Sequence, residues 1–329
     1  MTRVAVIQAG SILFDTPATV DKLRRLAAEA AAEGARLAVF PEAFVGGYPK
    51  GIDFGARVGS RSAEGREWFR RYYESAISVP GPETEAIGEA AAAHRMYMVV
   101  GVIERCGGTL YCTALFFGPD GALLDKHRKL MPTAMERLIW GMGDGSTIPV
   151  LDTEIGRIGA VICWENYMPL LRTAMYAGGI EIYCAPTVDD RDVWAASMRH
   201  IAVEGRCFVL SSAQYLTRAD CPDDYDPLQG NDPGTVLIRG GSSIIGPLGE
   251  ELVSPIYGRE EVLVADLDMA EIPRAKFDFD AVGHYARPDL FSLRVDRTPR
   301  SLLEPSEPDP PAQPFRVPPA AEPGARGEG

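Results

Sequence analysis

The chain has 329 residues, of which 46% are hydrophobic and 24% are charged, a composition typical of globular proteins. Its formal net charge of −13 argues against a nucleic-acid partner, because phosphate recognition requires clustered Lys and Arg. The N-terminus has no signal-peptide layout, and no apolar run approaches the length of a membrane span. We therefore expect a cytoplasmic protein that does not contact membranes.

The first half of the chain alternates strand and helix patterns. Thr16 and Pro17 provide a helix start, and Gly34 ends that helix. The Pro-Asp-Gly sequence at 119–121 predicts a hairpin. The predicted elements are a strand over 3–9, a helix over 17–33, a strand over 37–41, a helix over 82–94, a strand over 96–104, and hairpin strands over 111–117 and 122–124.

The second half continues in the same way. The predicted elements are strands over 159–163, 180–185, 208–213, 243–245, 251–253 and 262–267, with helices over 169–177 and 192–204. Because hairpins interrupt the alternation, a purely parallel sheet is excluded and mixed sheets covered by helices are expected. Nine of the 31 residues from Pro299 onward are proline. We expect one domain over residues 1–297 and a tail over 298–329 that is disordered or extended and carries no core.

The six cysteines form no C-x-x-C pair, so neither a metal site nor a disulfide framework is expected. Cys163 differs from the others in its position. It ends a predicted strand and is followed by Trp-Glu-Asn-Tyr and a helix, and a nucleophile at such a turn points outward beside a backbone N–H. A buried core cysteine is an equally good interpretation of this position alone.

Three charged residues have both a catalytic and an ordinary interpretation. Glu42 follows a strand within Phe-Pro-Glu-Ala-Phe, where burial raises a carboxyl pKa towards that of a useful base, although a strand-end glutamate often faces water. Lys129 belongs to Lys-His-Arg-Lys, which commonly is a solvated basic run. Glu136 has the spacing of a helix-surface residue paired with Arg137.

Together these segments resemble a known family. The motifs FPE, HRKLMPTAMERLIWGMGDGS and CWENYMPLLRTAMYAGGIEIYCAPT are similar to those of the nitrilase superfamily of carbon–nitrogen hydrolases. GGYPKGIDFG, SMRHIAVEGRCFVLSSAQ and GHYARPDLF fit its true nitrilase branch, which contains plant and related bacterial nitrilases. The resemblance extends over residues 4–297.

The resemblance implies a Glu–Lys–Cys triad of Glu42, Lys129 and Cys163, with Glu136 as a second family glutamate. It also implies an α/β fold, a four-layer α-β-β-α sandwich with two mixed β-sheets. Family members form homo-oligomers, as dimers that often extend into larger spiral assemblies. No metal and no organic cofactor is expected.

The implied reaction converts an organic nitrile to a carboxylic acid and ammonia, through a thioimidate and then a thioester on Cys163. Four further residues are expected at the substrate. Tyr48 follows glycines that allow the backbone to approach a ligand closely, and the backbone N–H of Trp164 is expected to stabilise negative charge. Pro186 and Thr187 are expected to form another wall of the pocket. Arylaliphatic nitriles or cyano-amino acids such as β-cyanoalanine are the expected substrates. The alternatives are an amidase or carbamoylase with the same triad, and a non-catalytic assembly protein.

Overall fold

The computed structural model describes residues 1–300; the predicted tail, apart from its first three residues, lies outside this range. A six-stranded mixed sheet begins the fold, with β1–β2 and β2–β5 parallel and the other pairs antiparallel. In spatial order its strands are β15 (Glu261–Leu267), β1 (Thr2–Gln8), β2 (Leu37–Val39), β5 (Tyr97–Cys106), β6 (Thr109–Phe117) and β7 (Leu123–Arg128).

The second sheet is also mixed, because β9, β10 and β11 are parallel while the remaining strands pair antiparallel. Its strands are, in order, β12 (Tyr215–Thr217), β13 (Val236–Ile245), β11 (Phe208–Ala213), β10 (Ile182–Thr187), β9 (Ile158–Ala160) and β8 (Val150–Leu151), and β14 (Glu251–Tyr257) pairs with β13. A small separate hairpin consists of β3 (Ala56–Arg57) and β4 (Ser60–Arg61).

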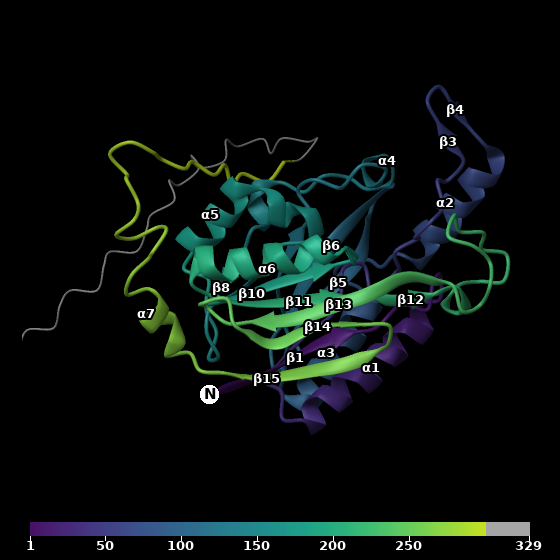
Figure 1. The fold of residues 1–329 in the computed structure, drawn as a ribbon. Helices are drawn as coiled ribbons and strands as arrows, with labels where there is room; N and C mark the ends of the chain where they lie inside the picture. Colours follow the sequence, from purple (N-terminus) through teal and green to yellow (C-terminus); the bar gives the residue numbers. More distant parts are fainter. Residues whose placement is uncertain (301–329) are drawn as a thin grey trace, which may run out of the picture.

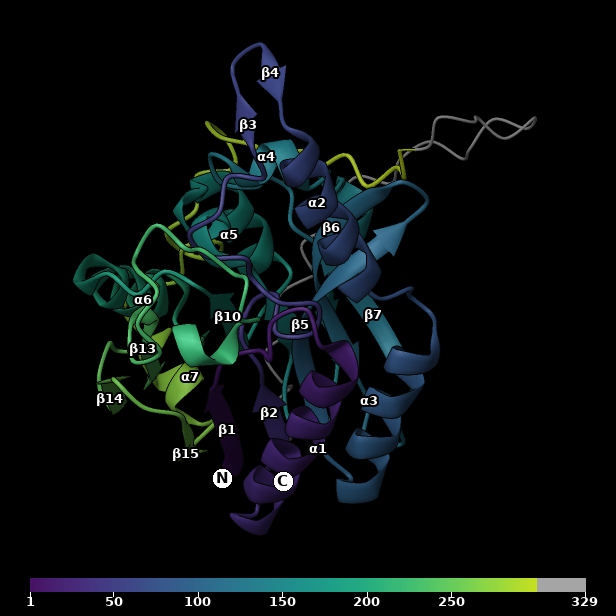
Figure 2. The same cartoon turned by 90° about the vertical axis from the view of Figure 1, so that its right-hand side faces the viewer.

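Helices cover the outer face of each sheet, as Figures 1 and 2 show. The first sheet is covered by α1 (Thr16–Ala32) and α3 (Pro82–His94), and the second by α5 (Pro169–Ala177) and α6 (Asp192–Gly205). The shorter or peripheral helices are α2 (Ala63–Ser75), α4 (Glu136–Ile139), α7 (Glu271–Ala275) and the 3₁₀ helices η1 (Gly145–Thr147), η2 (Cys163–Tyr167) and η3 (Arg218–Asp220). The helix α2 and the β3–β4 hairpin project from the body of the molecule.

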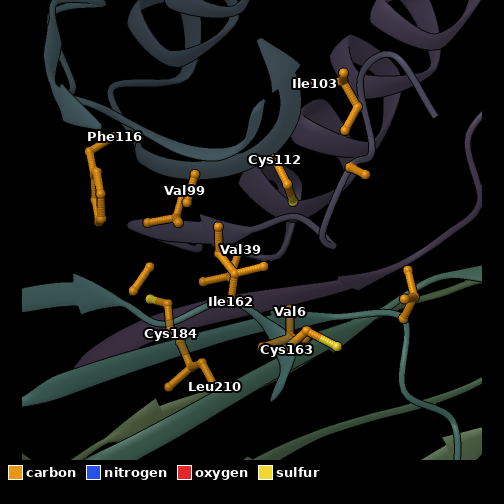
Figure 3. Close-up of a cluster of buried hydrophobic side chains, with 14 of the residues drawn as sticks. Val6, Val39, Val99, Ile103, Cys112, Phe116, Ile162, Cys163, Cys184 and Leu210 are labelled. Atoms are coloured by element: carbon orange, nitrogen blue, oxygen red, sulfur yellow. The ribbon is translucent and has the colours of Figure 1, made fainter. Parts of the chain in front are cut away.

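The main core lies between the two sheets. Strand alternation sends Val4 and Val6 of β1 into it, and Ile182 and Cys184 of β10 meet them from the other sheet. Figure 3 shows part of this layer, which also contains Cys112 and Cys163. Two further cores fill the space between each sheet and its helices. The order is therefore helix, sheet, sheet, helix, as the resemblance implied.

Sequence-based prediction missed or shifted some elements. The helix α2 was not predicted, although Ser62 provides an N-cap by accepting a hydrogen bond from the N–H of Gly65. The N-cap of α1 is Asp15, one residue before the expected Thr16. The strand β9 ends at Ala160, so Cys163 begins η2 instead of ending the strand. Within residues 1–300, no helix is both long and apolar enough to cross a membrane.

Candidate active site

Glu42 lies in the loop that follows β2 and is completely buried between the sheets. Its loop passes close to β5, where a Cβ on Gly101 would lie 2.0 Å from the carbonyl oxygen of Pro41. Only glycine therefore permits this approach. The next residue, Ala43, has a positive φ of 51°, a strained backbone conformation for a residue other than glycine.

Lys129 directly follows β7 and brings its ammonium to two carboxylates. Its Nζ lies 2.6 Å from Oε1 of Glu42 and 2.7 Å from Oε2 of Glu136. The Lys129 side chain is fully shielded from solvent, so these pairs are only weakly screened. Burial opposes the charge, but the carboxylates of Glu42 and Glu136 raise the pKa of Lys129 well above its usual value. Lys129 is therefore a permanent ammonium.

Glu136 is held at the start of α4 by three contacts. Its carboxylate accepts from the Lys129 ammonium, from the Tyr48 hydroxyl at 2.9 Å and from the Thr133 N–H at 2.6 Å. The structure thus pairs Glu136 with Lys129 and not with the neighbouring Arg137. Ala134, in the same loop, has a positive φ of 47°.

Cys163 lies at the sharp turn between β9 and η2, with a positive φ of 51°. The amide of Asn166 fixes this turn by donating to the carbonyl oxygens of Val161 and Cys163. The Thr187 hydroxyl donates to the Cys163 sulfur at 3.2 Å. Burial and the nearby Glu42 charge raise the pKa of Cys163, against the opposing effect of Lys129, so the resting group is a thiol.

The state of Glu42 complements this thiol. Burial, with a contribution from the Glu136 charge, raises the pKa of Glu42 although Lys129 opposes the shift. Its second oxygen accepts the Val188 N–H at 3.1 Å. Cys112, which sequence reasoning had not placed here, directs its sulfur to Oε1 of Glu42 at 3.6 Å. A buried carboxylate of raised pKa beside a thiol is suited to accept the thiol proton.

A cavity of about 270 Å³ opens at this cluster. Of the expected substrate-binding residues, Tyr48 and Trp164 line it, Thr187 contacts the Cys163 sulfur, and Pro186 is buried in β10 and absent from the lining. The residues that line it are Tyr48, Lys50, Thr133, Glu136, Cys163, Trp164, Val188, Asp189, Asp190 and Arg191. Within residues 1–300, no group of three or more His, Cys, Asp or Glu side chains is arranged to hold a metal ion.

Sequence reasoning also missed residues that shape this site. Asp189 accepts from the Trp164 indole at 2.8 Å and forms an ion pair with Arg191, which fixes one wall of the cavity. Glu165, two residues after Cys163, is buried and bonded to the segment that carries Lys129. Neither contact has a signal in a single sequence, because each depends on how loops from different strands meet.

Comparison with known proteins places the chain in a family. Residues 3–277 match the carbon–nitrogen hydrolase family. The chain is 60% identical to a protein described as an aliphatic nitrilase from Sinorhizobium fredii, over 92% of this chain and 97% of that one. It is also 60% identical to a bifunctional nitrilase/nitrile hydratase from Nicotiana tabacum, over 89% of this chain and 85% of that one. Nitrilase 2 of Arabidopsis thaliana is 54% identical, over 91% and 90%.

Solved structures agree on the fold. A mutant of the amidase from Nesterenkonia sp. AN1, with acrylamide added at its active-site cysteine, matches with a TM-score of 0.65 at 19% identity, over 83% of this chain and 96% of that one. A protein from Xanthomonas campestris described as a CN-hydrolase superfamily member matches with a TM-score of 0.65 at 20% identity, over 85% and 96%. This chain belongs to the carbon–nitrogen hydrolase family, in its nitrilase branch.

Proposed function

We propose that this protein is a nitrilase, which hydrolyses an organic nitrile to a carboxylic acid and ammonia with Cys163 as the nucleophile. One observation carries the proposal. A buried lysine ammonium is bonded to two glutamates beside a thiol that opens onto a cavity. The identity of 54–60% to proteins named as nitrilases supports nitriles as the substrate class.

The first half of the reaction forms a thioimidate. Glu42 takes the thiol proton as the Cys163 sulfur attacks the nitrile carbon, and passes it to the nitrile nitrogen as negative charge develops there. The Lys129 ammonium and the backbone N–H of Trp164 stabilise this charge. Neither has to move, because the structure already holds both in place. The resting thiol thus becomes a thiolate only when substrate is present.

The second half consumes two waters. Water adds to the thioimidate carbon, and the tetrahedral intermediate releases ammonia to leave a thioester on Cys163. Glu42, again a carboxylate, takes a proton from the first water and passes it to the nitrogen, which gains its third hydrogen from the new hydroxyl group as the thioester forms. Glu42 then takes a proton from the second water and returns it to the Cys163 sulfur as the acid is released. Glu136 positions Lys129 and contributes negative charge near the departing ammonium.

The cavity indicates a small substrate. Tyr48 and Trp164 provide aromatic walls, and Lys50 and Arg191 provide cations at the same cavity. Aromatic walls suit an arylaliphatic nitrile, and a cation suits the carboxylate of a cyano-amino acid. Both remain proposed substrate classes.

The test is ammonia release from a panel of nitriles and their matching amides, with Cys163→Ala as the inactive control. Turnover of nitriles by the wild type and none by Cys163→Ala is expected. Turnover of amides alone would make the protein an amidase or carbamoylase with the same residues. Absence of turnover on every compound would leave a non-catalytic assembly protein.

We also propose a cytoplasmic homo-oligomer, a dimer or a larger spiral assembly. All six cysteines are free thiols, as expected in a reducing compartment. On the outer helices α5 and α6, Leu170 and Val193 expose 69% and 58% of their surface, and homo-oligomers usually repeat one surface patch about a two-fold axis. Light scattering at micromolar concentration tests the assembly, and a monomer would contradict it.

A further inference from the structure

Glu165 is a buried carboxylate that the proposed chemistry does not use. Its Oε1 accepts the Leu130 N–H at 2.6 Å, and its Oε2 accepts the Ile162 N–H at 3.0 Å. The same Oε2 lies 3.0 Å from Nε2 of His127, and neither side chain has exposed surface. Glu165 does not line the cavity at Cys163, so it does not touch substrate there.

The partners of His127 fix its protonation. Its Nδ1 lies 2.5 Å from the carbonyl oxygen of Thr147, which only accepts, so Nδ1 carries a hydrogen. Its Nε2 faces the carboxylate of Glu165, whose two oxygens already accept backbone N–H groups. Burial disfavours the imidazolium, but Glu165 and the Thr147 carbonyl outweigh it and raise the pKa of His127. Both ring nitrogens of His127 therefore face oxygen acceptors, the Thr147 carbonyl on one side and the Glu165 carboxyl on the other.

The two backbone donors identify what this pair connects. Leu130 immediately follows Lys129, and Ile162 immediately precedes Cys163. Lys129 follows β7 of the first sheet, and Cys163 follows β9 of the second. One carboxylate therefore joins the two sheets at the residues next to the ammonium and the nucleophile.

We propose that the His127–Glu165 pair is a positioning device that sets the separation of the Lys129 ammonium and the Cys163 sulfur, and so controls the chemical step. The inference rests on the proposed function of these two groups. A misplacement of about 1 Å at a reacting centre can reduce a rate by roughly 100-fold, and neither His127 nor Glu165 lines the cavity that receives the substrate. The expected signature is thus a loss in kcat with little change in KM.

The structure supplies a matched control in Glu104. It is another buried carboxylate that is bonded to the same stretch of chain, through Lys126 and Arg128, and it contacts neither Leu130 nor Ile162. Glu165→Gln and Glu104→Gln each remove one buried negative charge. If the two pairs only stabilise the fold, both variants lower Tm and neither changes kcat.

The experiment compares kcat, KM and Tm for the wild type, Glu165→Gln, Glu165→Asp and Glu104→Gln on one accepted nitrile. We expect Glu165→Gln to lose about 100-fold in kcat with KM within threefold. Glu165→Asp keeps the charge and should recover part of the loss, and Glu104→Gln should lower Tm with kcat within threefold. A kcat within threefold for Glu165→Gln, together with a lowered Tm, would overturn the proposal.

Two additions keep the test decisive. If Glu165→Gln does not fold, His127→Gln leaves both backbone hydrogen bonds of Glu165 in place and is judged by the same criteria.

The second addition is the rate of Cys163 alkylation by iodoacetamide, followed by mass spectrometry, which needs no turnover. We expect it to slow at least fivefold in Glu165→Gln and to be unchanged in Glu104→Gln, and equal rates in the two variants would overturn the positioning role. Absence of wild-type turnover on all nitriles and amides would refute the proposed function, while alkylation would still decide the positioning.

Discussion

The stretch from Lys126 to Lys129 has two faces, and each face bonds to a different set of carboxylates. Lys126 and Arg128 reach Glu104 on one face, with side chains 25% and 21% exposed. His127 and Lys129 point between the sheets on the other face and are fully shielded. Strand alternation alone separates them, because successive side chains point to opposite sides. Of the four basic residues, Lys126 and Arg128 therefore hold a structural carboxylate, while His127 and Lys129 lie on the side of the proposed catalytic site.

The two faces differ in the ratio of cations to carboxylates. Glu104 has two cations, and although burial opposes its charge, Arg128 and Lys126 hold its pKa below the usual value. On the other face Glu42 and Glu136 share one cation, Lys129, and burial leaves the pKa of Glu42 raised. A carboxylate with two neighbouring cations stays ionised, whereas two carboxylates that share one cation leave one of them able to accept a proton.

The largest expected difference between the faces comes from Lys129→Met and Arg128→Met. Removal of Lys129 leaves Glu42 and Glu136 without their shared cation and removes charge stabilisation from the intermediates, so kcat should fall by at least about 10³-fold. Arg128→Met, one residue away on the other face, should keep kcat within a few-fold. Steady-state ammonia release measures both, and an equal loss in both variants would show that the faces are not functionally separate.

The second prediction concerns the product ratio of Glu136→Gln. The tetrahedral intermediate expels either ammonia, which leads to acid, or the Cys163 sulfur, which gives amide. A carboxylate near the nitrogen favours the ammonium form that leaves, so Glu136→Gln should lower turnover and raise the amide fraction. A change of about 1.4 kcal/mol between the two exits alters the ratio tenfold. Chromatography on one shared nitrile gives the ratio, and an unchanged ratio with a reduced rate would limit Glu136 to positioning.

Much of this arrangement was predictable from sequence. Alternation indicated the strands, and the motifs around Glu42, Lys129, Glu136 and Cys163 indicated the family and its site. The structure brings Glu42, Lys129 and Glu136 into direct contact, with Cys163 at the same cavity.

The remaining contacts depend on how the sheets stack. Glu165 bonds to the Lys129 segment across the two sheets, and Cys112 reaches Glu42 from β6, which β5 separates from β2 in the same sheet. Neither contact leaves a periodic pattern or a spacing in the chain. The helix α2 was missed although it carries a recognisable aromatic stripe: Tyr72 is buried, and Trp68, Phe69 and Tyr73 pack against the main core.

The third prediction uses pH to separate the faces. Glu42 must be ionised to act as base, and its pKa is raised, so kcat/KM should fall as the pH drops through a value above 4.5. The pKa of Glu104 is lowered, so its contribution to stability is present above about pH 4.5 and is lost only as the pH falls through its lower folded value. A pH interval should exist in which the protein is folded and inactive. A pH–rate profile and pH-dependent unfolding measure it, and coincident loss of activity and structure would contradict the prediction.

The smallest expected effect distinguishes the two cations of the structural face. Arg128 donates to both oxygens of Glu104, at 2.8 and 2.6 Å, whereas Lys126 donates to one at 2.6 Å. The Arg128 guanidinium also stacks on Tyr111, with its central carbon 4.1 Å from the centre of the ring. Arg128→Met should therefore lower the free energy of unfolding by about 2–3 kcal/mol, and Lys126→Met by only about 0.5–1 kcal/mol, because the guanidinium still neutralises Glu104. Urea unfolding measures both values. Equal losses would mean that the stabilisation from Glu104 depends on the number of its cations and not on their geometry. The bidentate Arg128 contact would then not explain the lowered pKa of Glu104.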